Sequence, residues 1–301
     1  MIRQEALMKI EKYKKKMRVM GVECKFEFDI REDEDGEARI VITKLYAEKG
    51  EEICIPSFVS YLDTVSGVMN CSEQTSCSDY TIFFPDGCDV LRGYIDSDRF
   101  VLRFSNGIAV GGGNPHFASE DGVLFRKDKR SLCLYPKEKR DAIYTIPESV
   151  CRIEEGAFDI TVHLEKLYIH ENVTEIGLSR VLPKVWIEVD EKNAVYKSVN
   201  GSLYSKDGKI LYHLCETGNE PIKIEEGTVQ VHVPDFYKVR FGTHEELYIP
   251  NTIEPTKDLV TLFSINTIDK FIVPEKLRGF IKKLEKEEHN IIAFGIYVEY
   301  Y

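Results

Sequence analysis

The chain has 301 residues, of which 43% are hydrophobic and 30% are charged. These proportions are typical of an ordered protein with a sizeable core and exclude a disordered chain. Its 51 Asp and Glu outnumber its 40 Lys and Arg, so the formal net charge is −11. This balance disfavours a protein that binds nucleic acid through dense positive charge, and we expect no nucleic acid partner.

Residues 1–25 are predicted to form an N-terminal capping helix. Apolar side chains recur there at helical spacing, while Lys and Arg cover most of the remaining surface. The apolar set is Ile2, Leu7, Ile10, Tyr13, Met17 and Met20. A solvated basic face is the simplest interpretation, and the alternative is a helix that lies on a membrane surface or binds an acidic partner.

Charged residues throughout this helix leave no apolar run of the length that a signal peptide needs. The longest run without Asp, Glu, Lys or Arg, residues 104–119, contains four Gly and a Pro and is unsuited to a membrane helix. We therefore expect no membrane insertion. The chain as written is expected to be cytoplasmic, or at the cell surface or secreted if it is a trimmed form.

Residues 26–65 are predicted to form a degenerate first unit of the repeat described below, and residues 66–113 an irregular inserted segment. Within the first unit, REDEDGE at residues 31–37 has the Asp and Gly spacing of a calcium loop. Its first ligand position is Arg31, however, and its twelfth is Ile42 rather than Glu. We therefore predict a hairpin turn there.

Two segments that lie 79 residues apart share one pattern. NPHFASEDGVLFRKDKRSLCLYP from Asn114 aligns without a gap with NAVYKSVNGSLYSKDGKILYHLC from Asn193, with identities at Asn, Gly, Leu, Lys, Asp and Leu. Each copy has a Gly turn, two strands of alternating apolar and polar residues, and a Lys-Asp turn. This pattern predicts a β-hairpin in each copy.

A shorter period of 23 or 24 residues runs alongside. IYTIPESV at residues 143–150 returns as LYIHENV at 167–173, and LYIPNTI at 247–253 returns as FIVPEKL at 271–277. A period in the low twenties with an apolar-x-x-apolar-x-apolar lead-in is the pattern of a leucine-rich repeat. In such a coil we expect Pro147 to end a short strand, and Val150, Ile153 and Phe158 to fill the interior.

The stretch IPESVCRIEEGAF…LEKLYIHENVTEIG resembles the BspA-like leucine-rich repeat family, whose units read Ile-Pro-x-x-Val-x-x-Ile-x-x-x-Ala-Phe. The hairpin pattern also resembles an insertion that is common between such units. The likeness extends over residues 114–177 and 193–277. The resemblance implies a curved right-handed solenoid with a role in protein interaction, often at bacterial or protist surfaces.

Residues 274–301 are predicted to form a C-terminal helix-strand cap. Together these segments predict a mainly β (α+β) solenoid: a leucine-rich repeat right-handed coil over residues 114–273, with two β-hairpin insertions and helical caps at both ends. We expect the solenoid to be continuous from about Phe26 to Val273, because a coil buries both of its edges only where coils stack on each side. The alternative is two domains divided near residues 111–114.

Motifs of catalysis and metal binding are absent from the sequence. GGGN at residues 111–114 lacks the Lys and Ser/Thr of a phosphate-binding loop, and no HExxH, GxSxG or CxxC occurs. We therefore predict no enzyme, no cofactor and no metal. The eight Cys are expected to be reduced and structural, with a disulfide between Cys71 and Cys77 as the alternative in an oxidising compartment.

Function is then expected from a surface. In a leucine-rich repeat strand, inward residues alternate with residues on the concave face, and we take Leu167 and Val185 as equivalent inward residues. The outward positions are then Tyr168, Trp186, Tyr248, Ile272 and, from the preceding unit, Thr145. Trp and Tyr are enriched at binding hot spots, so this set predicts a protein-binding groove. Two alternatives are that a loop or hairpin covers this face, and that the aromatic rings stack on a glycan.

Overall fold

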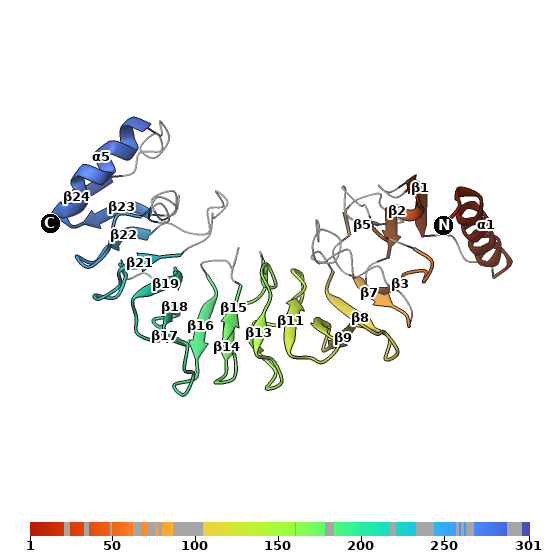
Figure 1. Ribbon diagram of the computed structural model, residues 1–301, viewed down its shortest axis with the longest axis horizontal. Coiled ribbons are helices and arrows are strands. Elements are labelled where there is room, and N and C mark those ends of the chain that lie inside the picture. Colours follow the sequence, from red (N-terminus) through yellow and green to blue (C-terminus); the bar gives the residue numbers. More distant parts are fainter. Residues whose placement is uncertain are drawn as a thin grey trace. The chain divides into compact units, whose positions relative to one another are not determined.

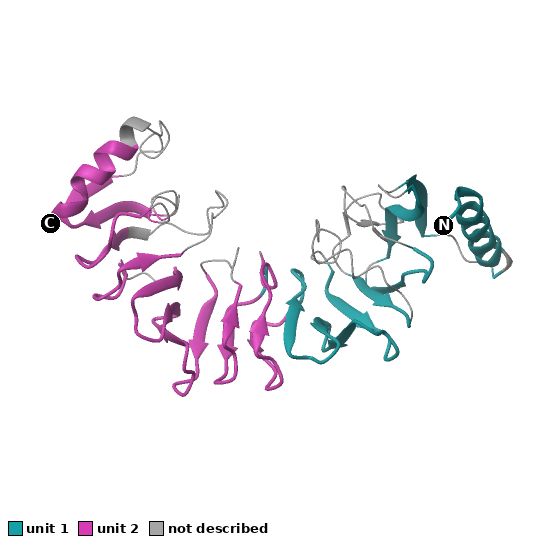
Figure 2. Cartoon of the chain, in the orientation of Figure 1, with its two compact units in different colours: residues 1–140, 161–163 teal, residues 141–160, 164–301 magenta. Residues whose placement is uncertain are grey.

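The fold is taken from a computed structural model (Figure 1). It describes residues 1–20, 25–32, 36–48, 50–59, 61–62, 68–70, 76–77, 80–86, 105–159, 161–177, 184–216, 221–232, 244–256, 259, 262, 268–287 and 297–301. The chain divides into two compact units (Figure 2). Unit 1 comprises residues 1–140 and 161–163, and unit 2 comprises residues 141–160 and 164–301.

Unit 1 contains, in chain order, α1 (Arg3–Val19), β1 (Phe26–Glu32), β2 (Ala38–Ala47), β3 (Glu51–Cys54), β4 (Tyr61–Leu62), β5 (Val68–Asn70), β6 (Ser76–Cys77), β7 (Tyr80–Phe84), β8 (Gly107–Val110), β9 (Phe117–Glu120), β10 (Val123–Arg126) and β11 (Ser131–Leu134). The predicted N-terminal helix is therefore present. It packs one face on β1 and β2 through the buried side chains Ala6, Ile10, Ile30, Ala38 and Ile40.

β1 and β2 pair antiparallel, with Glu32 opposite Ala38. The stretch REDEDGE therefore joins the two strands of a hairpin, as predicted, although residues 33–35 lie outside the described residues. On its other edge β2 pairs in parallel with β4 and β5, and β5 pairs antiparallel with β6.

β3, β7 and β8 form a parallel ladder, which is the arrangement of successive solenoid coils. Ile53, Ile82 and Ile108 lie in register across it and are all buried. β7 and β8 belong to residues 66–113, which the sequence predicts to be irregular, and the structure differs there. The segment lacks the Pro-terminated strand of the other units, but the alternation of Tyr80, Ile82 and Phe84 is enough to bury one face of β7.

Unit 2 contains, in chain order, β12 (Ile143–Thr145), β13 (Arg152–Ile153), β14 (Lys166–Ile169), β15 (Glu175–Ile176), β16 (Trp186–Val189), β17 (Tyr196–Val199), β18 (Ser202–Ser205), β19 (Ile210–His213), β20 (Ile222–Lys223), β21 (Gln230–Val231), β22 (His244–Tyr248), β23 (Ile268–Val273), the 3-10 turn η1 (Glu275–Leu277), α5 (Arg278–Glu287) and β24 (Tyr297–Tyr300). β12, β14 and β16 form one parallel sheet, and β13 and β15 pair in parallel along a second edge of the same coils.

The chain rounds each coil as the sequence predicts. β12 ends at Thr145, just before Ile146 and Pro147, and the amide of Val150 donates to the Pro147 carbonyl to make the turn (N···O 2.9 Å). Val150, Ile153 and Phe158 are buried. The predicted interior set, Ile146, Ile169, Ile187 and Ile249, is also buried throughout.

The two segments that lie 79 residues apart have the same structure. Each is a three-stranded antiparallel ribbon, β9–β10–β11 in unit 1 and β17–β18–β19 in unit 2, and each Gly turn has positive φ, +74° at Gly122 and +79° at Gly201. Three hydrogen bonds recur at this offset. The amide of Ile108 donates to the Gly122 carbonyl (2.8 Å), as that of Ile187 does to Gly201 (2.9 Å). The amide of Val110 donates to Ser119 Oγ (2.8 Å), as that of Val189 does to Ser198 Oγ (3.0 Å). Lys127 Nζ donates to the Gly112 carbonyl, as Lys206 Nζ does to that of Glu191 (both 2.7 Å).

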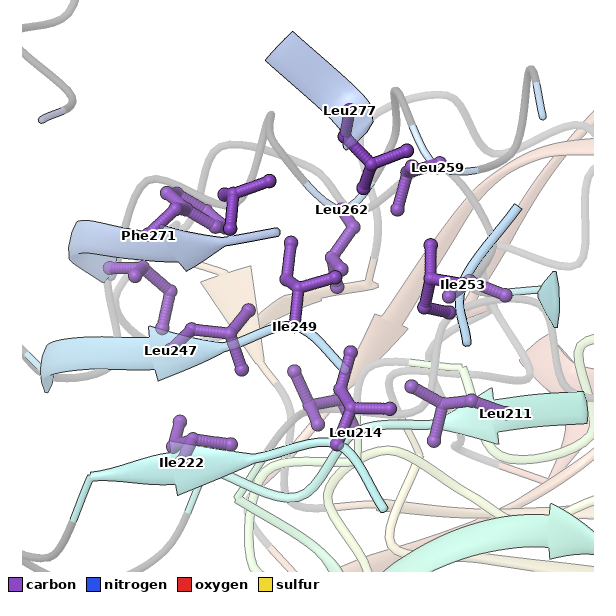
Figure 3. Packing of buried hydrophobic residues seen from close by; sticks show 14 of the residues in the cluster. Leu211, Leu214, Ile222, Leu247, Ile249, Ile253, Leu259, Leu262, Phe271 and Leu277 are labelled. Atoms are coloured by element: carbon purple, nitrogen blue, oxygen red, sulfur yellow. The ribbon is translucent and has the colours of Figure 1, made fainter. Parts of the chain in front are cut away.

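The C-terminal part of unit 2 is a second parallel sheet, in the order β20–β22–β23–β24, with α5 and β24 after residue 274 as predicted. Its inward side chains stack in register, with Ile222, Leu247 and Phe271 in one row. These residues, with Leu211, Leu214, Ile249 and others from the turns, form one buried cluster (Figure 3).

The predicted fold class, a mainly β solenoid of leucine-rich repeat type with hairpin insertions and helices near both ends, is confirmed. Cys54, Cys133, Cys151 and Cys215 are free thiols. Cys71 and the side chain of Cys77 lie outside the described part of the chain. Among the described residues, no helix is long and apolar enough to cross a membrane, and no group of three His, Cys, Asp or Glu is placed to hold a metal ion.

Candidate functional site

The candidate site is the outward face of the sheet β12–β14–β16. Tyr144, Leu167 and Ile187 lie in register and point inward, where they are buried. The residues that alternate with them form two outward rows across the three strands. We call them row 1 (Ile143, Lys166 and Trp186) and row 2 (Thr145, Tyr168 and Glu188).

Row 1 presents two large apolar side chains to solvent. Ile143 is 57% exposed and Trp186 is 37% exposed. The Lys166 ammonium between them reaches towards row 2, where its Nζ lies 2.8 Å from Glu188 Oε2 and 4.5 Å from the centroid of the Tyr168 ring. Hydrogen bonds to Glu188 and then to Tyr168 raise the pKa of Lys166, so this cation is held in place beside the two apolar side chains.

Trp186 also packs against the second ribbon. The Ile187 amide donates to the Gly201 carbonyl, and this brings the Gly turn over the start of β16. A Cβ at position 201 would lie 2.7 Å from Cδ2 of the indole and 2.8 Å from Sγ of Cys215. The Cα of Gly201 therefore covers one side of the indole, which explains why this exposed side chain is no more than 37% accessible.

A depression of about 550 Å³ lies at the end of row 2 and is lined by Thr145, Tyr168, His170, Glu188, Asp190 and Lys192, among others. Both ring nitrogens of His170 form hydrogen bonds with backbone groups of the coil turns. Nε2 lies 2.9 Å from the Pro147 carbonyl, which only accepts, and Nδ1 accepts from the amide of Asn172 (3.2 Å). His170 is thus a structural residue. The other polar side chains of the lining are the row 2 residues Thr145, Tyr168 and Glu188, together with Asp190, Glu191 and Lys192.

On the outward face of the second sheet, β20–β22–β23–β24, more of the side chains pair with one another than on the sheet β12–β14–β16. Lys270 Nζ bridges Glu246 (2.8 Å) and Glu299 (2.6 Å), and the Tyr248 hydroxyl donates to Glu246 (3.0 Å). The hydrogen bond from Lys270, and then that from Tyr248, lower the pKa of Glu246. The hydrogen bonds to Glu246 and then to Glu299 raise the pKa of Lys270. Ile272, next to Tyr248 in register, is only 7% exposed. Ile272, which the sequence predicts to be a binding residue, therefore offers little surface to a partner.

The structure corrects the predicted alignment of Trp186. The sequence takes Val185 as the equivalent of Leu167, whereas the equivalent residue is Ile187. A slip of two residues leaves every side chain on its own face, so Trp186 still points outward but lies beside Lys166 instead of Tyr168. Thr145 does lie beside Tyr168, as predicted.

Sequence reasoning missed Ile143, Lys166 and Glu188. Alternation around the inward Tyr144 was the signal that would have placed Ile143 at the surface. The ion pair of Lys166 with Glu188 joins β14 to β16, and it depends on the register that the two-residue slip obscured.

No protein-family model and no curated protein matches the chain. Solved structures with a similar fold include the pneumococcal vaccine antigen PcpA, which is 16% identical with a TM-score of 0.38, over 83% of this chain and 68% of that one. A leucine-rich repeat protein from Eubacterium ventriosum is 13% identical with a TM-score of 0.30, over 66% of this chain and 68% of that one. A leucine-rich cell surface protein from Faecalibacterium prausnitzii is 13% identical with a TM-score of 0.29, over 91% of this chain and 93% of that one. Leucine-rich repeat proteins are the class that the sequence resemblance names. At such identities and TM-scores, the likeness carries no information about a ligand.

Proposed function

We propose that this chain is a non-enzymatic protein-interaction module that binds its partner through row 1 and the neighbouring Tyr168 and Thr145. The observation that carries the proposal is the pair Ile143 and Trp186, two large apolar side chains exposed in one row of a sheet whose other face is buried. Clusters of this kind, with an aromatic anchor and a charged group at the edge, are where binding energy concentrates in protein interfaces. Tyr248, on the outward face of the second sheet, is proposed as a separate contact for the same partner.

A protein partner fits this surface better than a glycan does. Sugar rings stack on free aromatic faces, but the Lys166 ammonium already lies over Tyr168, and the Gly201 turn covers one side of Trp186. What is left is a mixed apolar and charged row, which suits a protein interface. A carbohydrate ligand is kept as an outcome of the test.

The test starts from proteins that co-purify with the chain from its native cells and compares two variants. Ile143→Glu places a charge in row 1 without removing a buried side chain. Val195→Glu makes the same chemical change at a residue of the second ribbon that is 37% exposed. We expect Ile143→Glu to weaken partner binding by roughly 10- to 30-fold, as loss of a hot-spot residue does, and Val195→Glu to bind as the unmodified chain does. Calorimetric titration measures both.

The single tryptophan gives a second readout, because burial of the Trp186 indole by a partner shifts its emission to the blue. Equal weakening by the two variants would contradict the proposal, as would full binding by Ile143→Glu. A glycan-array signal that Ile143→Glu abolishes, with no protein partner recovered, would replace the protein ligand by a carbohydrate.

A further inference from the structure

The N-terminal helix α1 has a charge opposite to that of the rest of the chain. It carries seven Lys and Arg against two Glu, a net charge of +5, in a chain whose net charge is −11. The remaining residues therefore carry −16. The cations of α1 are Arg3, Lys9, Lys12, Lys14, Lys15, Lys16 and Arg18.

Among the described residues, one face of α1 packs against the rest of the fold. Ala6 and Ile10 are buried against β1 and β2, and Tyr13 packs on Phe26, Phe28 and Phe58. On the opposite side, residues 8, 12 and 15 recur at helical spacing and lie along one stripe. Lys12, Lys15 and Arg18 there line a shallow depression with Glu11.

Apolar side chains accompany these cations on the exposed side of the helix. Leu7 is 50% exposed and Met8 is 62% exposed. They lie one turn before the basic cluster, by which we mean Lys12, Lys14, Lys15, Lys16 and Arg18. Ile2 and Met20 are exposed as well, so that four of the nine exposed large hydrophobic side chains of the described residues lie within residues 1–20. The exposed large apolar side chains within α1, Leu7 and Met8, thus lie in its first half, and five of its seven cations lie in its second half.

The basic cluster lacks counter-ions in the part of the chain that the structure describes. Arg3 approaches Glu32 at 4.0 Å. By contrast, Lys12, Lys14, Lys15, Lys16 and Arg18 form no ion pair with a described residue. Pairing with the described residues therefore uses none of these five charges, and we take them as available to an external anion.

We propose that α1 docks the chain peripherally on an anionic lipid surface. Leu7 and Met8 enter the headgroup layer, and the Lys cluster attracts the lipid phosphates and carboxylates, as polybasic segments do. This role is separate from the proposed partner binding, because α1 belongs to unit 1 and rows 1 and 2 to unit 2.

The composition of α1 favours a lipid surface over nucleic acid or an acidic protein. Five of the seven cations are Lys, a flexible point charge, whereas bidentate recognition of phosphates and bases relies on Arg. The cations also spread around most of the exposed circumference, which suits a planar layer of mobile headgroups more than a single shaped epitope. Exposed Leu and Met side chains gain nothing from a phosphate backbone but do gain from the acyl boundary.

The experiment is co-sedimentation of the full chain with vesicles of phosphatidylcholine alone and with vesicles that also contain phosphatidylserine. Three chains are compared: the unmodified chain, the triple variant Lys12→Gln, Lys15→Gln and Arg18→Gln, and a control with the same charge change at exposed positions of unit 2, Lys209→Gln, Lys276→Gln and Lys282→Gln. Circular dichroism confirms that each variant is folded.

We expect the unmodified chain to bind only the vesicles that contain phosphatidylserine, and to bind them less as the salt concentration rises. Each lost cation near an anionic surface weakens binding roughly fivefold, so the α1 triple variant should bind on the order of a hundredfold more weakly. The control should bind as the unmodified chain does. A second variant, Leu7→Gln with Met8→Gln, should also reduce binding.

Several results would overturn the proposal. Failure of the unmodified chain to sediment with the phosphatidylserine vesicles is one, and equal binding by the α1 variant and the control is another. Retention of the chain on duplex DNA or on an acidic polypeptide through the α1 cations, without vesicle binding, would assign the helix to that class of partner instead.

Discussion

Gly201 occupies a position where both the backbone and the surroundings require glycine. Its φ of +79° lies in the left-handed region, and a Cβ there would meet the Trp186 indole at 2.7 Å. Alanine adds about 1–2 kcal/mol of backbone strain and roughly 1–3 kcal/mol of overpacking. We therefore expect Gly201→Ala to destabilise unit 2 by about 2–5 kcal/mol, measured by urea unfolding with Trp186 emission.

Gly227→Ala is the matched control for this change. Gly227 also has positive φ, +99°, but a Cβ there has no atom within 4 Å. Gly227→Ala should therefore lower the free energy of unfolding only by the strain of the backbone, about 1–2 kcal/mol. If the two variants lose equal stability, the indole does not rest on Gly201 as described.

His213 makes the stability of unit 2 depend on pH. Its side chain is buried at the end of β19, with Nε2 3.0 Å from the Val185 carbonyl, and burial lowers its pKa to about 4. In the unfolded chain the pKa of histidine is near 6.5. Below that value the unfolded state binds a proton that the folded state does not, so the stability contribution is present above pH 6.5 and is lost as the pH falls towards 4.

The expected loss is about 3 kcal/mol between pH 6.5 and pH 4, at about 1.4 kcal/mol for each unit of pKa difference. His213→Gln keeps a donor for the Val185 carbonyl and does not titrate. Urea midpoints across this range, followed by Trp186 emission, should therefore fall less steeply for His213→Gln than for the unmodified chain. Parallel curves would show that other groups dominate the acid response.

At the level of elements, the two ribbons share one strand pairing and one set of hydrogen bonds. Besides the three recurring hydrogen bonds, the Oδ1 of Asn114 accepts from the amides of His116 and Phe117, and the Oδ1 of Asn193 accepts from those of Val195 and Tyr196. We expect a chain in which residues 114–134 replace residues 193–213 to fold with Trp186 emission close to that of the unmodified chain.

Four hydrogen bonds are lost in this exchange, and they set its cost. Phe125 takes the place of Tyr204, whose hydroxyl accepts from the Glu225 amide, and Leu134 takes the place of His213. Val123 and Arg126 take the places of Ser202 and Ser205, whose hydroxyls accept from the amides of Cys215 and Ile210. At about 1–2 kcal/mol for each lost hydrogen bond, the chain should be about 4–8 kcal/mol less stable in urea. An insert shifted by one residue, 115–135, is the control, and it should not fold because every side chain changes face. Equal behaviour of the two inserts would refute the equivalence.

At the level of the whole molecule, the sequence predicts those features that periodicity alone determines. The N-terminal helix, the two ribbons and the buried rows of unit 2 follow from apolar spacing and turn residues. The identity of Ser119 with Ser198, which the six counted identities leave out, was a further signal. Both hydroxyls accept an amide from the preceding strand.

Features that depend on which strands become neighbours could not be predicted. Val185 and Ile187 are both apolar and both buried, so the pattern allows either to align with Leu167. β7 and β8 lack a repeat signature and are recognisable only once their ladder with β3 is seen. The burial of Ile272, the ion pair of Lys166 with Glu188 and the packing of Trp186 on Gly201 all arise between segments that are distant in sequence.

The recurrence of one hydrogen-bond pattern at an interval of 79 residues has a consequence for how the chain folds. During folding, β8 and β16 each meet two ribbons that offer the same Gly carbonyl and the same Ser hydroxyl, and repeat proteins misfold through such exchanges. The copies also differ at the start of these two strands, because Trp186 stands where the first copy has Gly107. A swapped pairing would set Gly107 over Gly201 and remove the packing of the Trp186 indole on that glycine. The tryptophan that we propose contacts a partner in the finished protein would thus also direct each strand, during synthesis, to its own ribbon.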